Sequence, residues 1–396
     1  MSTVMRQTLP AFSPVSSPPI RVTLVNDLNA LAARRLQWNE LAERSQTSTI
    51  FQTYEWHVSW WKTLRGNARP LILLAEAGDE LVGIAPLMVS ERRRFGQTRR
   101  VVQLIGLGAS DFCDLIVDRA RPDVLPKFAE WLMDYSQLWD VIHLHDVPNT
   151  SSTLDHLSQC FRQRGYRTDI RFLYEAPTRL LGDPVEDAQV IRKKSLRRHV
   201  NYFQRNGRLQ FKNCHSVDEI IGYLDLFFEQ HIERRALTDT PSQFLDKQQR
   251  SFYRELVYRL APTGWLLFSV VLFNDEPIAF HFGFEYDGRL MWYKPTFNVR
   301  YAQHSPGEVL IKYLLEYAIE QGVAEFDFTI GEEPFKYRFA NHCRSNYALR
   351  VFRRPVDYQV HRAWCETKAW VKKSPRLAQW GRTLLGMFQT SHRARA

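Results

Sequence analysis

The stretch from residue 288 to residue 340 constrains the fold of this chain most, because it carries a nearly complete set of helix signals. Ser305 can serve as an N-cap, Pro306 suits the first helical position, and Glu308 lies three residues after Ser305, which completes a capping box. Apolar residues then recur at helical spacing up to Gly322, a natural stop. The pattern predicts a helix from Ser305 to just before Gly322.

Strands are expected on both sides of this helix, at residues 289–295 and 325–330, and a loop at 331–338 follows the second strand. A loop that leads into a helix N-terminus beside a strand leaves free N–H groups, and such groups can bind an anion. We therefore expect the chemistry of the chain in this region.

The two halves of the chain repeat one order of elements. The turn Asp79-Glu80-Leu81-Val82-Gly83 has a counterpart in Asp275-Glu276-Pro277-Ile278-Ala279, and both turns stand between runs typical of a hairpin. The predicted fold class is α/β, with tandem units that each form a mixed, mostly antiparallel sheet flanked by helices. The predicted divisions are a disordered N-terminus at 1–19, units at 20–185 and 186–355, and a basic amphipathic helical tail at 356–396.

The expected elements follow from periodicity and from turn residues. In the first unit they are strands at 20–25, 70–76, 81–89, 101–105, 115–117 and 140–145, and helices at 27–44, 122–138 and 154–165. In the second they are a strand at 208–215, helices at 217–235 and 242–260, a hairpin of 265–273 with 278–286, and closing strands near 347–353.

Three basic segments stand out. The helix predicted at 190–206 joins the two units, and its cations form either a solvated face or a clamp for phosphates or an acidic substrate. A basic loop is expected at 92–100. The tail at 356–396 interleaves Trp with Lys and Arg, reads as two helices broken near Pro375, and either packs on the body or rests on an anionic membrane face.

The net charge of +10 favours acidic partners such as phosphates, anionic glycans or lipid headgroups. The five cysteines are scattered and form no CxxC pair, so neither a disulfide framework nor a zinc site is expected, and a reducing cytosol fits. His143 and His145 share a strand face without an evident third ligand, so no metal site is predicted. No membrane span or secretory signal is evident. We expect a cytoplasmic protein, with a peripheral position at the inner membrane as an open alternative.

The second half contains five further motifs: Ile278-Ala279-Phe280-His281-Phe282-Gly283-Phe284, Trp292-Tyr293-Lys294-Pro295, Ser305-Pro306-Gly307-Glu308-Val309-Leu310, Phe326-Asp327-Phe328, and Gly331-Glu332-Glu333-Pro334-Phe335-Lys336-Tyr337-Arg338. Together they resemble the CelD and BioF-like acetyltransferase family. That family lies within the GNAT superfamily and is related to the Fem aminoacyl transferases, which carry two GNAT-like units. The resemblance covers about residues 51–353, and residues 300–307 depart from the spacing of the familiar GNAT pyrophosphate motif.

The resemblance implies acyl transfer from a thioester, with acyl-CoA such as acetyl-CoA as co-substrate, to an amine or a hydroxyl. Envelope or exopolysaccharide biosynthesis is the implied context. Such transfer needs a base for the nucleophile, donors for the oxyanion and an acid for the leaving group.

The strand at 278–286 carries His281, Gly283 and Glu285 on one face. A strand covered on both faces should be apolar throughout, so these residues indicate a wet cavity in which Gly283 leaves room for a substrate. A His–Glu hydrogen bond at a sheet surface is the alternative.

Asp327 alternates with phenylalanines and either orients a base or ties down the turn at Gly331. Lys336 either neutralises developing negative charge or forms a surface ion pair. His231 matches a helical His of the family that the chain resembles. The predicted catalytic residues are His281 or His231 as the base, Asp327 and Lys336, and one concavity is expected to join His281, Asp327 and Lys336. The predicted cofactor-binding residues are Arg300, Ser305, Pro306 and Gly307. The predicted substrate-binding residues are Glu285, Tyr293, Tyr337 and Arg338.

The leading hypothesis is a GNAT-like acyltransferase that acts on a small amine or sugar, with an amino sugar or sugar hydroxyl as the first acceptor to test. One alternative is a Fem-like transferase that uses aminoacyl-tRNA; no DNA partner is expected. The other is a non-catalytic partner of polysaccharide-synthesis machinery at the membrane face.

Overall fold

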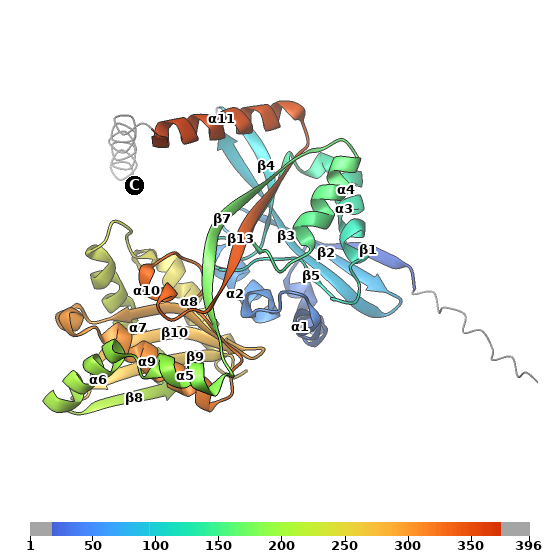
Figure 1. Ribbon diagram of the computed structural model, residues 1–396. Helices are drawn as coiled ribbons and strands as arrows, with labels where there is room; N and C mark the ends of the chain where they lie inside the picture. Colours follow the sequence, from blue (N-terminus) through green and yellow to red (C-terminus); the bar gives the residue numbers. More distant parts are fainter. Residues whose placement is uncertain (1–17, 95, 374–396) are drawn as a thin grey trace, which may run out of the picture.

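The computed structural model describes residues 18–94 and 96–373 (Figure 1). Most of the chain surrounds one continuous 13-stranded sheet with the order β1-β2-β3-β4-β6-β13-β7-β12-β11-β10-β9-β8, and β5 pairs with β3 off this path. Of the strand pairs in the described residues, β4–β6 and β11–β12 are parallel and the others antiparallel. The fold class is therefore the predicted mixed α/β class.

The strands are β1 (Ile20–Val25), β2 (Arg69–Ala77), β3 (Glu80–Arg94), β4 (Gln97–Leu104), β5 (Ile116–Val117), β6 (Val141–Pro148), β7 (Arg167–Leu180), β8 (Leu209–Cys214), β9 (Leu266–Phe273), β10 (Glu276–Tyr286), β11 (Arg289–Phe297), β12 (Glu325–Asp327) and β13 (His342–Phe352). The helices are α1 (Arg35–Arg44), α2 (Tyr54–Leu64), α3 (Val124–Asp134), α4 (Thr153–Gln163), α5 (Pro184–Ile191), α6 (Lys194–Asn206), α7 (Val217–Ala236), α8 (Lys247–Leu260), α9 (Pro306–Glu320), α10 (Pro334–Tyr337) and α11 (Pro355–Lys373). Five short 3-10 helices complete the described chain, including η1 (Asn29–Arg34) and η5 (Val299–His304).

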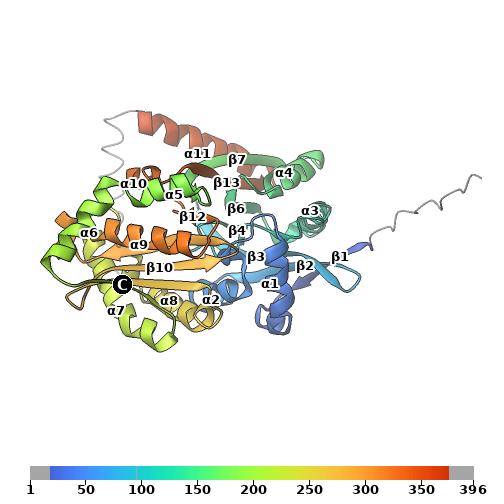
Figure 2. The same cartoon turned by 60° about the horizontal axis from the view of Figure 1, so that its bottom comes forward.

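A long crossing pair of strands, β7 and β13, connects the two halves of the molecule (Figures 1 and 2). β13 lies between β6 and β7, and β7 also pairs with β12 of the second half. β13, the last strand of the described residues, thus completes the sheet of the first half. The boundary predicted at residues 185 and 186 falls within α5 and stays a prediction.

The two halves also share a hydrophobic core. Trp56 of α2 contacts Phe284 of β10 and Tyr293 of β11, with ring centroids 5.6 and 5.9 Å apart. Phe51 and Phe112 of the first half belong to the same buried cluster. Because burial of apolar surface is the main stabilising contribution, this cluster fixes the first half against β10 and β11.

The predicted hairpin of each half and the predicted long helix of the second half are confirmed. The β2–β3 and β9–β10 hairpins turn at the two matched motifs, and α9 occupies the predicted position. The predicted capping box is wrong: Ser305 has left-handed backbone angles (φ 52°, ψ 58°) and its side chain caps nothing. The carboxylate of Glu308 instead accepts a hydrogen bond from Arg338 at 2.9 Å.

Several other element predictions need correction. The basic loop expected at 92–100 is the tip of the β3–β4 hairpin, with Arg92 opposite Arg99. The helix expected at 190–206 is divided into α5 and α6 because Lys193 leaves the helical region at φ −50° and ψ 133°. One face of α6 is buried, and it consists of Leu196, His199, Val200 and Phe203.

The ends of the chain were predicted as a disordered segment and a tail of two helices. Residues 1–17 and 374–396, including the region after Pro375, lie outside the described residues. The first tail helix is α11. In the described part of the chain, no helix is both long enough and apolar enough to cross a bilayer.

Candidate functional site

A cavity of about 220 Å³ lies where the two halves meet. Its walls come from the loop after β4, the last turns of α7, the middle of β11, and the segment from the loop after β12 into α10. The polar side chains that line it include Asp111, His231, Arg234, Lys294, Thr329 and Lys336. We call this space the cationic cavity.

An irregular turn after β12 positions Lys336. Thr329 (φ 58°) and Gly331 (φ 119°) both have left-handed backbone angles, which favour glycine. A Cβ at residue 331 would overlap a carboxylate oxygen of Glu333 and lie 3.0 Å from Nζ of Lys336. Lys336 Nζ donates to the carbonyl of Ile330 at 2.6 Å and pairs with Glu333 at 3.0 Å. The lysine is 4% exposed, so the turn holds a buried ammonium group in the cavity wall.

The first half contributes Asp111 to the same cavity. The backbone carbonyl of Asp111 accepts a hydrogen bond from Asn346 at 2.9 Å, and Tyr293 donates its hydroxyl hydrogen to the carbonyl of Ala109. Burial raises the pKa of the Asp111 carboxyl, although the charges of Lys294 and Lys336 oppose the shift. Asp111 is therefore a buried carboxylate with raised basicity, facing two ammonium groups.

The remaining cations give the cavity an excess of positive charge. Burial lowers the pKa of Lys294, with Asp111 as the main opposing charge. Arg234 donates to the carbonyl of Pro295 at 2.8 Å, and Arg235 lies beside it at the end of α7. Asp111 and Glu333 are the acidic residues of the lining, against four Lys and Arg. An anionic ligand or a developing oxyanion is favoured in such surroundings.

His231 lines the cationic cavity in a neutral state. Its Nδ1 is 2.7 Å from Oγ of Ser242. Burial lowers its pKa to about 3, and the charges of Arg235, Arg234 and Lys294 act in the same direction. The imidazole is thus a weak base at neutral pH, which disfavours the predicted role of His231 as general base.

The predicted gap beside His281 is not present. The ring of His281 is 0% exposed, stacks on Trp292 with centroids 5.2 Å apart, and lies 3.2 Å from the carbonyl oxygen of Met291 through Nε2. A Cβ at residue 283 would overlap this ring, so Gly283 makes room for His281 and not for a substrate. Burial lowers the pKa of His281 to about 3. The expected concavity joining His281, Asp327 and Lys336 is therefore absent. Asp327 and Lys336 line two different cavities, and His281 lines neither of them.

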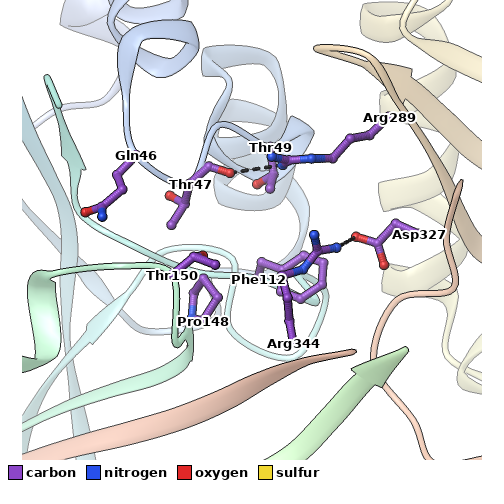
Figure 3. A pocket seen from close by; sticks show the side chains of 9 residues that line it. All are labelled: Gln46, Thr47, Thr49, Phe112, Pro148, Thr150, Arg289, Asp327 and Arg344. Atoms are coloured by element: carbon purple, nitrogen blue, oxygen red, sulfur yellow. Dashed lines mark hydrogen bonds and ion pairs between the residues drawn. The ribbon is translucent and has the colours of Figure 1, made fainter. Parts of the chain in front are cut away.

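Asp327 belongs to a different, smaller space of about 90 Å³, which we call the paired cavity (Figure 3). Arg344 of β13 forms ion pairs with Asp327 and with Glu325. Arg289 pairs with Glu325 at 3.1 Å and donates to the carbonyl of Ser48 at 2.8 Å. Burial raises the pKa of Asp327 to about 6 although Arg344 opposes it. Its surroundings fit the structural alternative for Asp327, a buried carboxylate that also accepts the backbone N–H of Thr329 at 2.7 Å.

The other predicted residues lie outside the cationic cavity. Glu285 accepts a hydrogen bond from Tyr317 at 2.9 Å, Tyr337 donates to Glu175 at 2.7 Å, and Arg338 pairs with Glu308. Arg300 is exposed on η5, and residues 305–307 begin α9. These positions leave the predicted binding roles as predictions.

Of the twelve predicted site residues, the cationic cavity brings together His231, Tyr293 and Lys336. Asp111, Lys294, Thr329 and the pair Arg234 and Arg235 were not predicted as site residues. A signal for Asp111 existed in the sequence, since Gly106 and Gly108 directly follow a predicted strand and both have left-handed backbone angles in the structure.

The cationic cavity therefore holds a buried base beside ammonium donors, within reach of both halves. Such an arrangement can take a proton from a nucleophile and stabilise negative charge on a carbonyl oxygen. These are two of the three requirements of acyl transfer.

Comparison with known proteins gives one domain match and several structures of similar fold. Residues 191–337 match the model of the acetyltransferase (GNAT) domain. A search of curated proteins found no match. Among solved structures, FemX is similar with a TM-score of 0.59 at 10% identity, covering 82% of this chain and 98% of that chain.

Two further solved structures share the fold. The C-terminal domain of a proposed lysylphosphatidylglycerol synthetase from Agrobacterium fabrum gives a TM-score of 0.54 at 12% identity, covering 83% of this chain and 94% of that chain. A protein of unknown function from Bacteroides thetaiotaomicron gives 0.52 at 12% identity, covering 84% of this chain and 100% of that chain. Residues 191–337 thus match a GNAT acetyltransferase domain, and the chain shares its overall fold with these solved structures.

Proposed function

We propose, from the GNAT domain at residues 191–337, that the chain transfers an acyl group from acyl-CoA to an amine or hydroxyl acceptor in the cationic cavity. The observation that supports this proposal most is that the buried Asp111 lines the same cavity as Lys294 and Lys336. The GNAT domain supplies the two lysines, and the first half supplies the carboxylate. The proposed site is therefore complete only when both halves are joined.

The reaction uses these groups in order. Asp111 accepts a proton from the acceptor nitrogen or oxygen, which attacks the thioester carbonyl. The new bond to carbon forms while the carbonyl oxygen becomes negative, and Lys336 stabilises that charge with Lys294. The C–S bond then breaks, and the thiolate takes the proton held by Asp111. Atoms and charge balance without any further reactant.

The start of α9 remains the proposed contact for the donor phosphates. Pro306 has no N–H, and the N–H groups of Glu308 and Val309 donate to the carbonyl of Ser305, so the N–H of Gly307 is the amide that the start of α9 offers to an anion. Arg300 is exposed, lies six residues before Pro306 in the sequence, and can add a positive charge. The finer proposal, from the resemblance, is a CelD and BioF-like enzyme that modifies an amino sugar or sugar hydroxyl for a cell-envelope polysaccharide.

Thermal-shift titration and thiol release test the proposal together. We expect acetyl-CoA or a longer acyl-CoA to raise the Tm in a saturable way, and an amine or sugar acceptor to trigger release of free CoA. Asp111→Asn should lower kcat by about 10²–10⁴-fold because the base is lost. His231→Gln is the matched control within the cavity, and its effect on kcat should be much smaller.

A different set of results would overturn the assignment. Equal loss of kcat in Asp111→Asn and His231→Gln would return the base to His231. No Tm shift and no thiol release with any acyl-CoA would leave the aminoacyl-tRNA donor and the non-catalytic role as the remaining hypotheses.

One observation favours the aminoacyl-tRNA donor as a second candidate. An open groove of about 740 Å³ runs along α6 between Lys194, Arg197, Arg198 and Arg205. None of these cations forms an ion pair with an acidic side chain of the described residues. Tyr202 lies among them, stacked on His304 with centroids 3.5 Å apart. Cations beside an exposed aromatic ring are typical of nucleic-acid contacts.

The dependence of binding on salt concentration distinguishes aminoacyl-tRNA from acyl-CoA as the donor. Binding of a tRNA through this groove should weaken steeply as salt rises, whereas acyl-CoA binding should change less. Arg197→Glu with Arg205→Glu should abolish activity with aminoacyl-tRNA and leave activity with acyl-CoA unchanged. If acyl-CoA activity is lost as well, the groove belongs to the acyl-CoA site.

A further inference from the structure

Helix α11 presents apolar side chains on two opposite faces. On the inner face, Tyr358 and His361 pack on Phe352 of β13, with ring centroids 5.6 and 5.1 Å apart. On the outer side, Val356 is 58% exposed, Val360 is 48% exposed and Trp370 is 64% exposed. A period of 3.6 residues places these three on one side of the helix, with Ala363 and Thr367 between them. We call this row the outer stripe.

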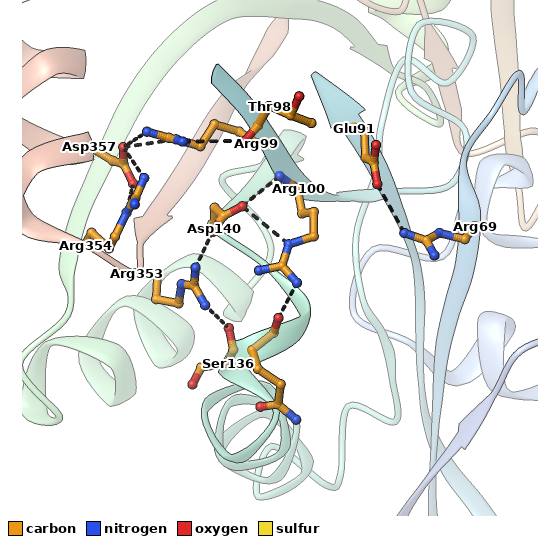
Figure 4. A network of polar contacts seen from close by, with 11 residues as sticks. Arg69, Glu91, Thr98, Arg99, Arg100, Ser136, Asp140, Arg353, Arg354 and Asp357 are labelled. Atoms are coloured by element: carbon orange, nitrogen blue, oxygen red, sulfur yellow. Dashed lines mark hydrogen bonds and ion pairs between the residues drawn. The ribbon is translucent and has the colours of Figure 1, made fainter. Parts of the chain in front are cut away.

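Polar contacts hold α11 in an orientation that keeps the outer stripe on the outside, and Figure 4 shows those of Asp357. Asp357 of the first turn accepts hydrogen bonds from Arg99 at 3.1 Å and from Arg354 at 2.9 Å. His361 pairs with Asp169 of β7 at 3.0 Å. Rotation of the helix that buried the stripe would break these contacts, so the exposure of the stripe is built into the fold.

The surface around the N-terminus of α11, which we call the root of α11, carries excess positive charge. Four guanidinium groups share two carboxylates there: Arg99 and Arg354 contact Asp357, and Arg100 and Arg353 contact Asp140. Arg93 adds an exposed cation on the β3–β4 hairpin, which reaches the same end of the molecule in Figure 1. Along the helix, Arg362 is balanced by Glu366. The outer stripe thus lies beside uncompensated cations.

We propose that the outer stripe of α11 and the cations at its root form a docking surface for a membrane rich in anionic lipid. Exposed Val and Trp side chains on a helix insert at the boundary of headgroups and acyl chains, and neighbouring Arg and Lys contact acidic headgroups. This inference goes beyond the proposed transfer reaction and does not depend on it. It gives the enzyme a fixed orientation at a surface.

The positive charge around the outer stripe favours an anionic lipid surface over a second copy of the chain or residues 374–396 as the group that covers it. A second copy docked by the same face would bring two cationic surfaces together, which is unfavourable. Residues 374–396 carry Arg376, Arg382, Arg393 and Arg395 and no Asp or Glu, so this segment would also add like charge. An anionic bilayer is the occupant that neutralises the surface.

Vesicle flotation of the full chain tests the proposal. We expect the protein to float with vesicles of phosphatidylcholine and phosphatidylglycerol, to remain unbound with phosphatidylcholine alone, and to be released by salt. Val360→Ser with Trp370→Ser should weaken binding by about tenfold or more, an effect of ~1.4 kcal/mol or more. Leu237→Ser is the matched control, because Leu237 is 76% exposed at the end of α7, and it should bind like the parent chain.

Three results would overturn the proposal. One is the absence of flotation with anionic vesicles, and another is flotation that the double variant leaves unchanged. The third is a concentration-dependent dimer in sedimentation that the double variant abolishes, which would assign the stripe to a second copy. Far-UV circular dichroism of each variant confirms that the fold is retained.

Discussion

The cationic cavity and the paired cavity lie on either side of one short loop segment, and they treat charge in opposite ways. Phe112 lines the paired cavity, and its neighbour Asp111 lines the cationic cavity. Arg289 and Arg344 line the paired cavity, and both are held in ion pairs: Arg344 with the lining residue Asp327, and both arginines with Glu325, which lies outside the lining. Two guanidinium groups are thus matched by two carboxylates. In the cationic cavity, cations outnumber anions.

This difference in charge distinguishes the two cavities more clearly than burial does. Both cavities hold buried carboxylates whose pKa burial raises, Asp327 to about 6 in one and Asp111 in the other. A perturbed pKa therefore marks both, although such shifts are often used to locate active sites. The useful distinction is whether each cation of a cavity has a carboxylate partner, as Arg289 and Arg344 do, or whether the lining as a whole has more cations than carboxylates, as in the cationic cavity.

The largest expected effect comes from removal of one cation from the paired cavity. Arg344→Met leaves Glu325 and Asp327 buried with less compensation, so the free energy of unfolding should fall by about 3–5 kcal/mol. Urea denaturation measures this change. Adding Asp327→Asn to the same chain should restore part of the loss, because one uncompensated charge is removed. A loss of activity without a loss of stability would show that the paired cavity binds substrate.

The pH dependence of kcat/KM for acyl transfer gives the next largest expected difference between the two cavities. Asp111 must be ionised to act as a base, so kcat/KM should fall as the pH drops through the raised pKa of Asp111. Lys294 opposes that rise, so Lys294→Met should move this acidic limb upward by about one pH unit or more. Arg344→Met should leave the limb in place. A limb that disappears in His231→Gln would contradict the assignment of the base to Asp111.

Two glycine-to-alanine substitutions form a matched pair, and their expected effects on stability and rate are smaller. Gly331→Ala and Gly78→Ala both place a Cβ on a left-handed backbone, at φ 119° and φ 64°, and each should cost about 1–2 kcal/mol of stability. A Cβ at residue 331 also meets Glu333 and Lys336, whereas a Cβ at residue 78 meets nothing within 4 Å. Transfer should therefore slow in Gly331→Ala only, by about tenfold, as seen in initial rates normalised to folded protein. Equal rates in the two variants would show that the position of Lys336 is unimportant.

The smallest effect is expected at Arg338, which was predicted to bind substrate. It forms a partly exposed pair with Glu308, so Arg338→Ala should cost about 0.2–1 kcal/mol of stability. The kcat/KM of Arg338→Ala should stay close to that of the parent chain. A large rise in KM would extend the substrate site beyond the cationic cavity toward α9.

The sequence was sufficient for the elements whose signals are local. The two hairpin turns and the helix after Ser305 follow from residues a few positions apart, and all three are observed. β7 was missed because residues 167–180 mix charged and apolar side chains without a clear alternation. Its pairing with β12 and β13 depends on segments far along the chain.

The site was harder to predict for the same reason. Asp111 and Lys336 meet although 225 residues separate them in the sequence. Gly283 was interpreted as room for a ligand, but the space is filled by the ring of His281, two residues away. Spacing identifies which residues share a strand face, and it does not show which neighbour fills the space above them.

The position of β13 between β6 and β7 also governs the order in which the protein can assemble during synthesis. The strands on either side of this slot end at Pro148 and Leu180, whereas the strand that fills it begins at His342. A nascent chain must therefore keep two open strand edges apart while more than 160 residues emerge. Until then, those edges are exposed to other chains, and a ribosome that stalls before residue 342 would release an aggregation-prone fragment.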